Sequence, residues 1–171
     1  MHATDYLTIL NILVAFLGVV LVVFAFFEWR SLRVIKRDFI RLESRLRAEN
    51  HIAMKAAHRV ITSYAIKDID ARIALLESAV AEYPQAFNGY NALGYAWLEK
   101  GETARAVDAF HRAIELHPQD KAGYCDLAHA HLAAGQEDLA LRYLQQAVSV
   151  DATALHDIQQ DARLKELAAR L

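Results

Sequence analysis

The sequence predicts an all-helical protein, in which one N-terminal transmembrane helix continues into a helical stalk, followed by stacked helix hairpins and a C-terminal capping helix. Three observations lead to this prediction. Residues 6–27 include no Asp, Glu, Lys or Arg. The 171-residue chain has only two prolines and six glycines, so little of it is predicted to be loop. Its C-terminal half also resembles itself at an offset of 34 residues.

The charge-free segment is predicted to cross a membrane. As a helix, its 22 residues span about 33 Å at ~1.5 Å per residue, close to the ~30 Å hydrocarbon core of a bilayer. Its apolar residues face all sides, which suits lipid. A cleaved signal peptide would need a basic start and small residues at the cleavage site, and this chain has neither. We therefore expect an uncleaved transmembrane helix over residues 6–28, after a short extracytoplasmic N-terminus of residues 1–5.

The residues that flank this segment predict its orientation. Tyr6 and Trp29 stand at its two ends, as aromatic residues of the membrane interface do. Four basic residues follow the second end: Arg30, Arg33, Lys36 and Arg37. The positive-inside rule then places the N-terminus outside and the remainder of the chain in the cytoplasm.

Residues 29–50 are predicted to form a basic helical stalk. Residues 30–50 carry seven Lys or Arg against three Asp or Glu. Apolar residues recur there at alternating spacings of three and four: Leu32, Ile35, Phe39, Leu42 and Leu46. This seam predicts either a short coiled coil, which would make a homo-oligomer, or a single amphipathic helix lying on the bilayer or on the following domain.

The internal repeat predicts helix hairpins that stack. Eight pairs are identical at the 34-residue offset: Gly89/Gly123, Tyr90/Tyr124, Leu93/Leu127, Ala96/Ala130, Leu98/Leu132, Gly101/Gly135, Ala106/Ala140 and Ala113/Ala147. Gly94 allows a neighbouring helix to approach closely, Gly101 suits the end of a first helix, and Pro118 ends a second one. A single hairpin cannot bury its apolar face alone, so the units must stack.

These residues resemble the tetratricopeptide repeat, whose pattern is an aromatic residue, Leu-Gly, a second aromatic residue, then Ala, Phe, Ala and Pro. Residues 87–120 match at nine positions: Tyr90, Leu93, Gly94, Trp97, Gly101, Ala106, Phe110, Ala113 and Pro118. Residues 121–154 match with His131 and Ala152 at the second aromatic and proline positions. The resemblance implies an α-solenoid.

The two ends of the solenoid match less completely. Residues 51–86 fit the pattern only in their second helix, through Leu76, Ala79 and Pro84, and are predicted to be a degenerate hairpin. Residues 155–171 are predicted to form one capping helix. Its apolar residues stand among charged ones: Ile158, Leu164, Leu167 and Leu171.

The resemblance also implies a binding groove. In this family the first helix of each hairpin lines a concave surface that receives a peptide of a partner protein. Carried over by position, the groove residues are Asn88, Asn91, Tyr95, Leu98, Cys125, His129 and Leu132, with Ile61 and Tyr64 from the degenerate hairpin. His131 is assigned to the same surface.

These groove residues predict the kind of ligand. Asn91 offers a donor and an acceptor to a peptide backbone, and Tyr95 and Tyr64 are candidate aromatic anchors. None of the assigned residues is basic. A clamp of Lys and Arg for the C-terminal carboxylate of a partner is therefore not expected.

The sequence does not predict an enzyme, a metal or a cofactor. Cys125 and His129 are one helical turn apart, but two ligands on one turn do not make a metal site. A nucleophilic Cys125 would also need a third, orienting group. The chain has no Gly-rich phosphate loop and no Ser-centred elbow. Its formal net charge of −2 argues against nucleic acid as the main partner.

Together these features predict a membrane-anchored bacterial tetratricopeptide repeat protein. We expect a single-pass protein of the inner membrane, in contact with the lipid bilayer, with its repeats in the cytoplasm. Its predicted role is that of a scaffold or assembly factor that recruits a protein client through the groove. Two alternatives are a self-assembling structural oligomer and an accessory subunit of a larger membrane complex, held through its transmembrane helix.

Overall fold

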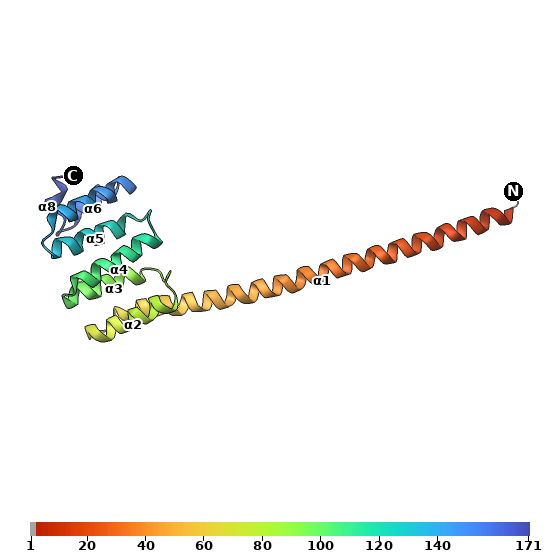
Figure 1. Ribbon diagram of the computed structural model, residues 1–171, viewed down its shortest axis with the longest axis horizontal. Helices are drawn as coiled ribbons and strands as arrows, with labels where there is room; N and C mark the ends of the chain where they lie inside the picture. The colour runs from red at the N-terminus through yellow and green to blue at the C-terminus, as the bar shows by residue number, and fades with distance from the viewer. Residues whose placement is uncertain (1–2) are drawn as a thin grey trace. The chain divides into compact units, whose positions relative to one another are not determined.

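The computed structural model describes the backbone of residues 3–171 and the side chains from residue 10 onward. The described helices are α1 (Ala3–Ser63), α2 (Ile69–Glu82), α3 (Gly89–Lys100), α4 (Thr103–Leu116), α5 (Lys121–Ala133), α6 (Glu137–Val150), α7 (Ala154–Gln160) and α8 (Lys165–Ala168) (Figure 1). Residues 3–171 contain no strand, which confirms the all-helical prediction. Residues 1–2 of the predicted N-terminal segment and the side chain of Tyr6 lie outside the described residues.

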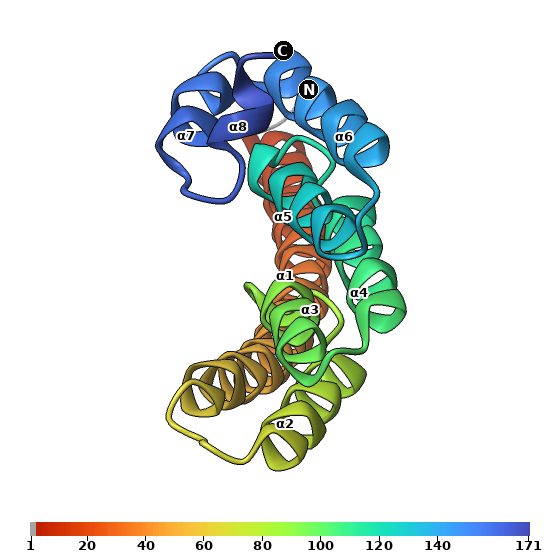
Figure 2. The same ribbon diagram turned by 90° about the vertical axis from the view of Figure 1, so that its left-hand side faces the viewer.

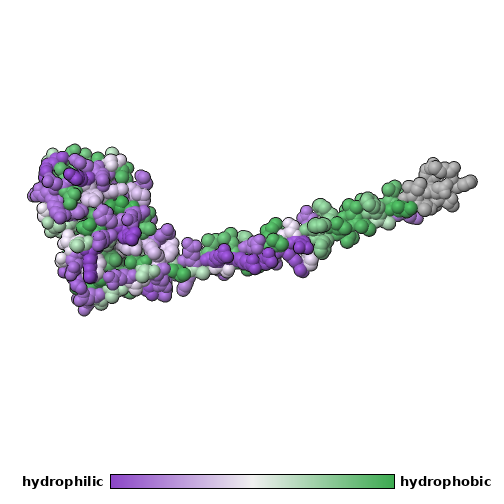
Figure 3. Space-filling model, in the orientation of Figure 1, coloured by the Kyte–Doolittle hydropathy of each residue, from purple (hydrophilic) through white to green (hydrophobic). Residues whose placement is uncertain are grey.

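The chain divides into two compact units, Met1–Glu49 and Asn50–Leu171. In the first unit, the side chains of residues 10–27 are all exposed, and Figure 3 shows an apolar surface along this part of α1. Among the described helices, α1 is the one that is long and apolar enough to cross a membrane, judged by length and composition. The prediction of a long apolar N-terminal helix is therefore confirmed.

The stalk portion of α1 is also exposed. The five seam residues have half or more of their surface open within the first unit: Leu32, Ile35, Phe39, Leu42 and Leu46. Next to the apolar part, the guanidinium carbon of Arg33 lies 3.5 Å from the centre of the Trp29 ring, a cation–π contact. An ion pair of 2.5 Å joins Arg47 to Glu43 one turn away, as expected for a solvated helix.

The second unit is a stack of helix pairs. Residues 50–63 of α1 pair with α2, and α3–α4 and α5–α6 are the next two pairs. Figure 2 shows α3 and α5 along the inner side of a curve, with α2, α4 and α6 along its outer side. The fold predicted from the repeat, tetratricopeptide-type helix hairpins in an α-solenoid, is thereby confirmed.

Glycines set the spacing and the turns of these pairs. A Cβ atom added to Gly94 would lie 2.5 Å from the ring of Phe110, so the two helices of the pair approach more closely than any side chain there would allow. Gly101 follows α3 with φ of +85°, and Gly135 follows α5 with φ of +72°. These left-handed conformations favour glycine and end the first helix of each pair.

The degenerate hairpin is a complete helix pair in the structure. Ala56 and Val60 of α1 share a buried cluster with Ile73, Leu76 and Ala79 of α2. At its open edge the pair is joined by charges: Lys55 and Arg59 both bind the Glu82 carboxylate. The apolar spacing of residues 50–63 therefore supports packing even though the family's signature residues are missing.

The C-terminal cap differs from the single helix predicted over residues 155–171. The structure has two short helices, α7 and α8, because the Asp161 carboxylate accepts hydrogen bonds from the backbone N–H groups of Arg163 and Leu164, at 2.8 and 3.3 Å. Such local bonds compete with helix continuation. The turn buries Leu164 against the last repeat.

Candidate functional site

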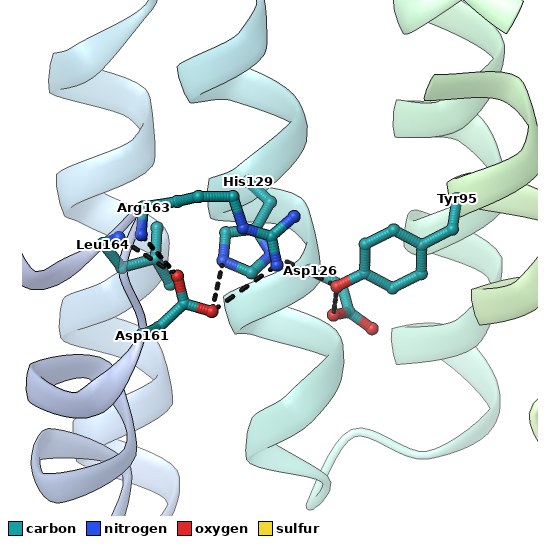
Figure 4. A network of polar contacts seen from close by, with 6 residues as sticks. All are labelled: Tyr95, Asp126, His129, Asp161, Arg163 and Leu164. Carbon is teal, nitrogen blue, oxygen red and sulfur yellow. Dashed lines mark hydrogen bonds and ion pairs between the residues drawn. The ribbon is translucent and has the colours of Figure 1, made fainter. Parts of the chain in front are cut away.

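A polar network lies on the inner side of the solenoid, between α3 and α5. At its centre, the Asp126 carboxylate accepts a hydrogen bond from Asn91 Nδ2 at 2.5 Å and another from the Tyr95 hydroxyl. The His129 Nδ1 atom lies 3.2 Å from the Tyr95 oxygen (Figure 4). Two predicted groove residues of one repeat thus bind the next repeat directly.

The repeat itself explains why these side chains meet. Tyr95 and His129 are 34 residues apart, so they occupy the same position in consecutive repeats and stack as neighbours. The Tyr95 ring also packs edge-on against Phe110, with centroids 5.2 Å apart. This core contact fixes the ring and aims the hydroxyl at α5.

The turn between α7 and α8 completes the network from the other side. The Asp161 Oδ2 atom lies 3.3 Å from His129 Nε2, a close approach without hydrogen-bond alignment. The Arg163 guanidinium is 3.5 Å from the same carboxylate. Figure 4 shows how these groups converge on α5 from the terminal segment.

Burial and nearby charges shift the pKa values of Asp126, His129 and Asp161. Burial raises the pKa of Asp126, and the bonds from Tyr95 and Asn91 oppose the rise. Burial and the Arg163 charge lower the pKa of His129, while Asp161 acts in the opposite direction. The net effect favours the neutral ring. For Asp161, burial favours the neutral acid, but the backbone N–H and the guanidinium of Arg163 favour the carboxylate, and the pKa is lowered.

Three hollows adjoin the network. The first, of about 250 Å³, lies between α5 and the terminal segment, and its lining includes Tyr95, Cys125, Asp126, His129, Asp161 and Arg163. The second, of about 530 Å³, is lined by residues that include Tyr95, Leu98, His129, Leu132 and Arg163. The third, of about 620 Å³, is lined by Phe87, Asn88, Asn91 and residues 116–120. Seven of the predicted groove residues line these hollows, whereas Ile61 and Tyr64 line none of the three.

Two interpretations of the sequence require correction. His131 does not line the inner surface: it is buried, and its ring stacks on Tyr143 of α6 with centroids 5.2 Å apart. Residues two apart on a helix point in different directions, so His129 and His131 cannot share a face. The inner surface is also not free of basic residues, because Lys121 and Arg163 both line the first hollow.

Several residues of the site had no signal in the repeat pattern. Asp126 falls at a position where the preceding repeat has Ala92, so the pattern gave no reason to select it. Asp161 and Arg163 belong to the turn that replaces the predicted helix. Phe87 is 81% exposed and follows Pro84 in an inter-repeat turn, where its exposure was not predictable.

Two observations bear on the chemistry of the site. No group of three or more His, Cys, Asp or Glu among the described residues is placed to hold a metal ion. Burial and the charge of Asp126 raise the pKa of the Cys125 thiol to about 11. An activated thiol needs the opposite shift.

Comparisons with known proteins agree with this fold. Residues 87–120 and 122–153 each match a family model described as tetratricopeptide repeat. Two similar solved structures are entitled "Crystal structure of MamA protein", with 23% identity and a TM-score of 0.54, and "Crystal structure of MamA", with 20% identity and a TM-score of 0.56. The first likeness covers 59% of this chain and 55% of that chain, and the second covers 75% and 78%.

No curated protein matches this chain. At these identities the likeness to the solved structures bears on the fold alone, and the chain spans only about half of the first of them. The repeat matches, the glycine-spaced helix pairs and the curved stack all lead to one conclusion. Residues 87–153 of this chain are tetratricopeptide repeats.

Proposed function

We propose that this protein is a membrane-anchored scaffold or assembly factor that recruits a protein client through the inner surface of its repeats. Tetratricopeptide repeats are protein-interaction modules, so protein binding is the general role of the domain. The observation that carries the specific proposal is the set of three hollows beside the polar network, whose linings include both polar and apolar side chains. A raised thiol pKa at Cys125 and the absence of a metal cluster from the described residues favour binding over catalysis.

Exposed aromatic and apolar side chains support a protein ligand. Phe87 lines the third hollow beside Asn88 and Asn91. Ile61 and Tyr64, at the end of the first pair, are likewise largely exposed. Aromatic side chains are the residues that most often dominate binding energy at interfaces. We propose that Phe87 and Tyr64 are apolar anchors, and that the amide of Asn88 adds polar contacts.

The N-terminal half of α1 supports an anchor in the bacterial inner membrane. Its apolar side chains from residue 10 to residue 27 are exposed, which suits contact with lipid. Trp29 and the basic residues after it fit the interface on the cytoplasmic side. We propose a single-pass topology with the N-terminus outside and the repeats in the cytoplasm.

The groove proposal is tested by quantitative affinity capture of the full chain from native membranes. A Phe87→Ala/Asn91→Ala variant should lose its captured client at least about tenfold, since hot-spot truncations cost roughly 2 kcal/mol or more each. Arg112→Ala is the matched control, because Arg112 is exposed on α4 of the outer side. Equal capture by the double variant, with unchanged helical circular dichroism, would refute the groove.

Self-assembly through the stalk is the second candidate, and the exposed seam favours it. The five seam residues fit positions a and d of two heptads, and membrane anchoring would raise their effective concentration. Light scattering of the detergent-solubilised chain should then give a mass above that of a monomer, reduced by Leu32→Glu/Phe39→Glu. A strictly monomeric wild type excludes this candidate. The role of an accessory subunit, held through the transmembrane helix, remains a third proposal.

A further inference from the structure

The first hollow has one carboxylate, Asp126, that is left over after the ion pairs among its lining residues are taken into account. Its ionisable lining consists of Lys121, Asp126, His129, Asp157, Asp161 and Arg163. Lys121 is already paired with Asp157 at 2.7 Å and with Asp151 at 3.5 Å. Among the described residues, Asp126 has no cation within ion-pair distance, and only Asn91 and Tyr95 donate to it. Each carboxylate oxygen has a further lone pair, so Asp126 can accept more hydrogen bonds.

A buried acceptor in the same hollow also lacks a donor. The Tyr95 hydroxyl gives its hydrogen to Asp126, so only its lone pairs face His129 Nδ1, and in the neutral ring Nδ1 must carry the hydrogen. The Nε2 atom is then an acceptor. It has no hydrogen-bond partner among the described residues, although His129 is only 7% exposed. The Asp161 Oδ2 atom, 3.3 Å away, is another acceptor.

The side chain of Arg163 reaches into this acceptor-rich region from the terminal turn. It lines both the first and the second hollow, together with Tyr95 and His129. Its charge lowers the pKa of Tyr95, Asp126 and His129 relative to their values without it, so the guanidinium lies within electrostatic reach of all three.

Arg163 is nevertheless loosely held. Its one ion pair in the described chain is the 3.5 Å contact with Asp161, two residues away, and 59% of its side chain is exposed. Exposed pairs of this kind contribute about 1 kcal/mol or less. The guanidinium can therefore leave the hollow at little cost.

We propose that the first hollow binds an arginine side chain of the partner protein, and that Arg163 fills this place in the free chain and is displaced on binding. The proposal rests on the groove function above and adds the chemistry of the ligand. A guanidinium carries five N–H donors in a planar fork and keeps its charge when desolvated. It therefore supplies the donor that His129 Nε2 lacks and further donors that the Asp126 carboxylate can accept.

The test uses the full chain in detergent micelles and a short fluorescein-labelled Gly/Ala peptide with one central arginine. Fluorescence anisotropy gives its Kd, beside peptides with central glutamate or alanine. The arginine peptide should bind best. Arg163→Ala should tighten its binding about threefold or more, since a competing exposed pair is removed. Asp126→Asn should weaken it about tenfold, as expected for truncating one side of a partly buried charge pair.

The matched control is Arg112→Ala, which removes the same charge from an exposed site on the outer side and should leave the Kd unchanged. Because Arg163 is largely exposed, its variant folds as the wild type does, and thermal unfolding by circular dichroism verifies this for Asp126→Asn. Weaker or unchanged arginine-peptide binding by Arg163→Ala, or preferred binding of the glutamate peptide, overturns the proposal.

The outcome is separable from that of the groove proposal. If client capture depends on Phe87 and Asn91 but the arginine peptide does not bind, the groove stands and the ligand chemistry is wrong. If the arginine peptide binds as expected but client capture is unaffected by the groove variant, the arginine site stands and the groove as the client site is wrong.

Discussion

At the scale of single residues, the inner surface is organised by one carboxylate. Asp126 receives donors from Asn91 and Tyr95 of the preceding repeat, so it joins two repeats as well as facing the first hollow. Buried polar groups of this kind are costly unless they are satisfied. The same contacts that make α3 and α5 fit together therefore also decide which ligand groups the surface accepts.

His129 gives this surface a dependence on pH. Burial and the Arg163 charge lower its pKa in the folded state below the ordinary value of 6.5, so the unfolded chain binds the proton more readily. We expect the free energy of unfolding of the full chain to fall as the pH decreases below about 6.5. Urea titrations followed by circular dichroism between about pH 5.5 and 7 should show a shallower decrease for His129→Asn. A variant with the full wild-type slope would contradict this.

At the scale of elements, the terminal segment (residues 154–171) packs against the last repeat and covers its end. The Asp161 turn stops α7, and the chain then returns to bury Leu164 and Leu167 beside Leu144 of α6. This closes the apolar end of the stack, which a solenoid requires. It also delivers Arg163 to the inner surface, so the cap and the candidate site are built from one turn.

Leu164 is one of the buried residues that join this cap to the last repeat. It is 1% exposed, and we expect Leu164→Ala to destabilise the cap by about 2–5 kcal/mol, the usual cost of such a truncation in a packed core. In Leu164→Ala, the rate of amide hydrogen exchange relative to the wild type should increase more in α7 and α8 than in α3 and α4. Leu171→Ala is the matched control, since Leu171 is 39% exposed and should change little. Equal effects of the two substitutions would show that the cap does not depend on this contact.

At the scale of the whole molecule, two units of different character share one chain. The first unit exposes apolar and basic side chains along α1, and the second buries its apolar residues between helix pairs. Exposed apolar area of this extent is unfavourable in water. We therefore expect lipid or a protein partner to cover the apolar side chains of the first unit, whereas the second unit buries its apolar side chains in its own core.

The proposed topology gives a direct expectation. In a bacterial host, the full chain should stay in the membrane fraction after alkaline carbonate extraction. Added protease should degrade the repeats in inverted vesicles but leave them intact in spheroplasts, because the basic flank keeps the repeats inside. Release by carbonate would contradict the anchor, and cleavage in intact spheroplasts would contradict the orientation.

The sequence by itself determined the repeat architecture, because the 34-residue offset repeats the small and apolar positions that packing demands, such as Gly94 against Phe110. It determined in the same way that α3 and α5 present Tyr95 and His129 to each other. Only the tertiary structure decided the rest of the site. The Asp161 turn depends on bonds between a side chain and nearby backbone, which helical periodicity does not encode. Asp161 and Arg163 lie beside His129 because that turn folds back onto α5, an arrangement that no pattern local to either segment specifies.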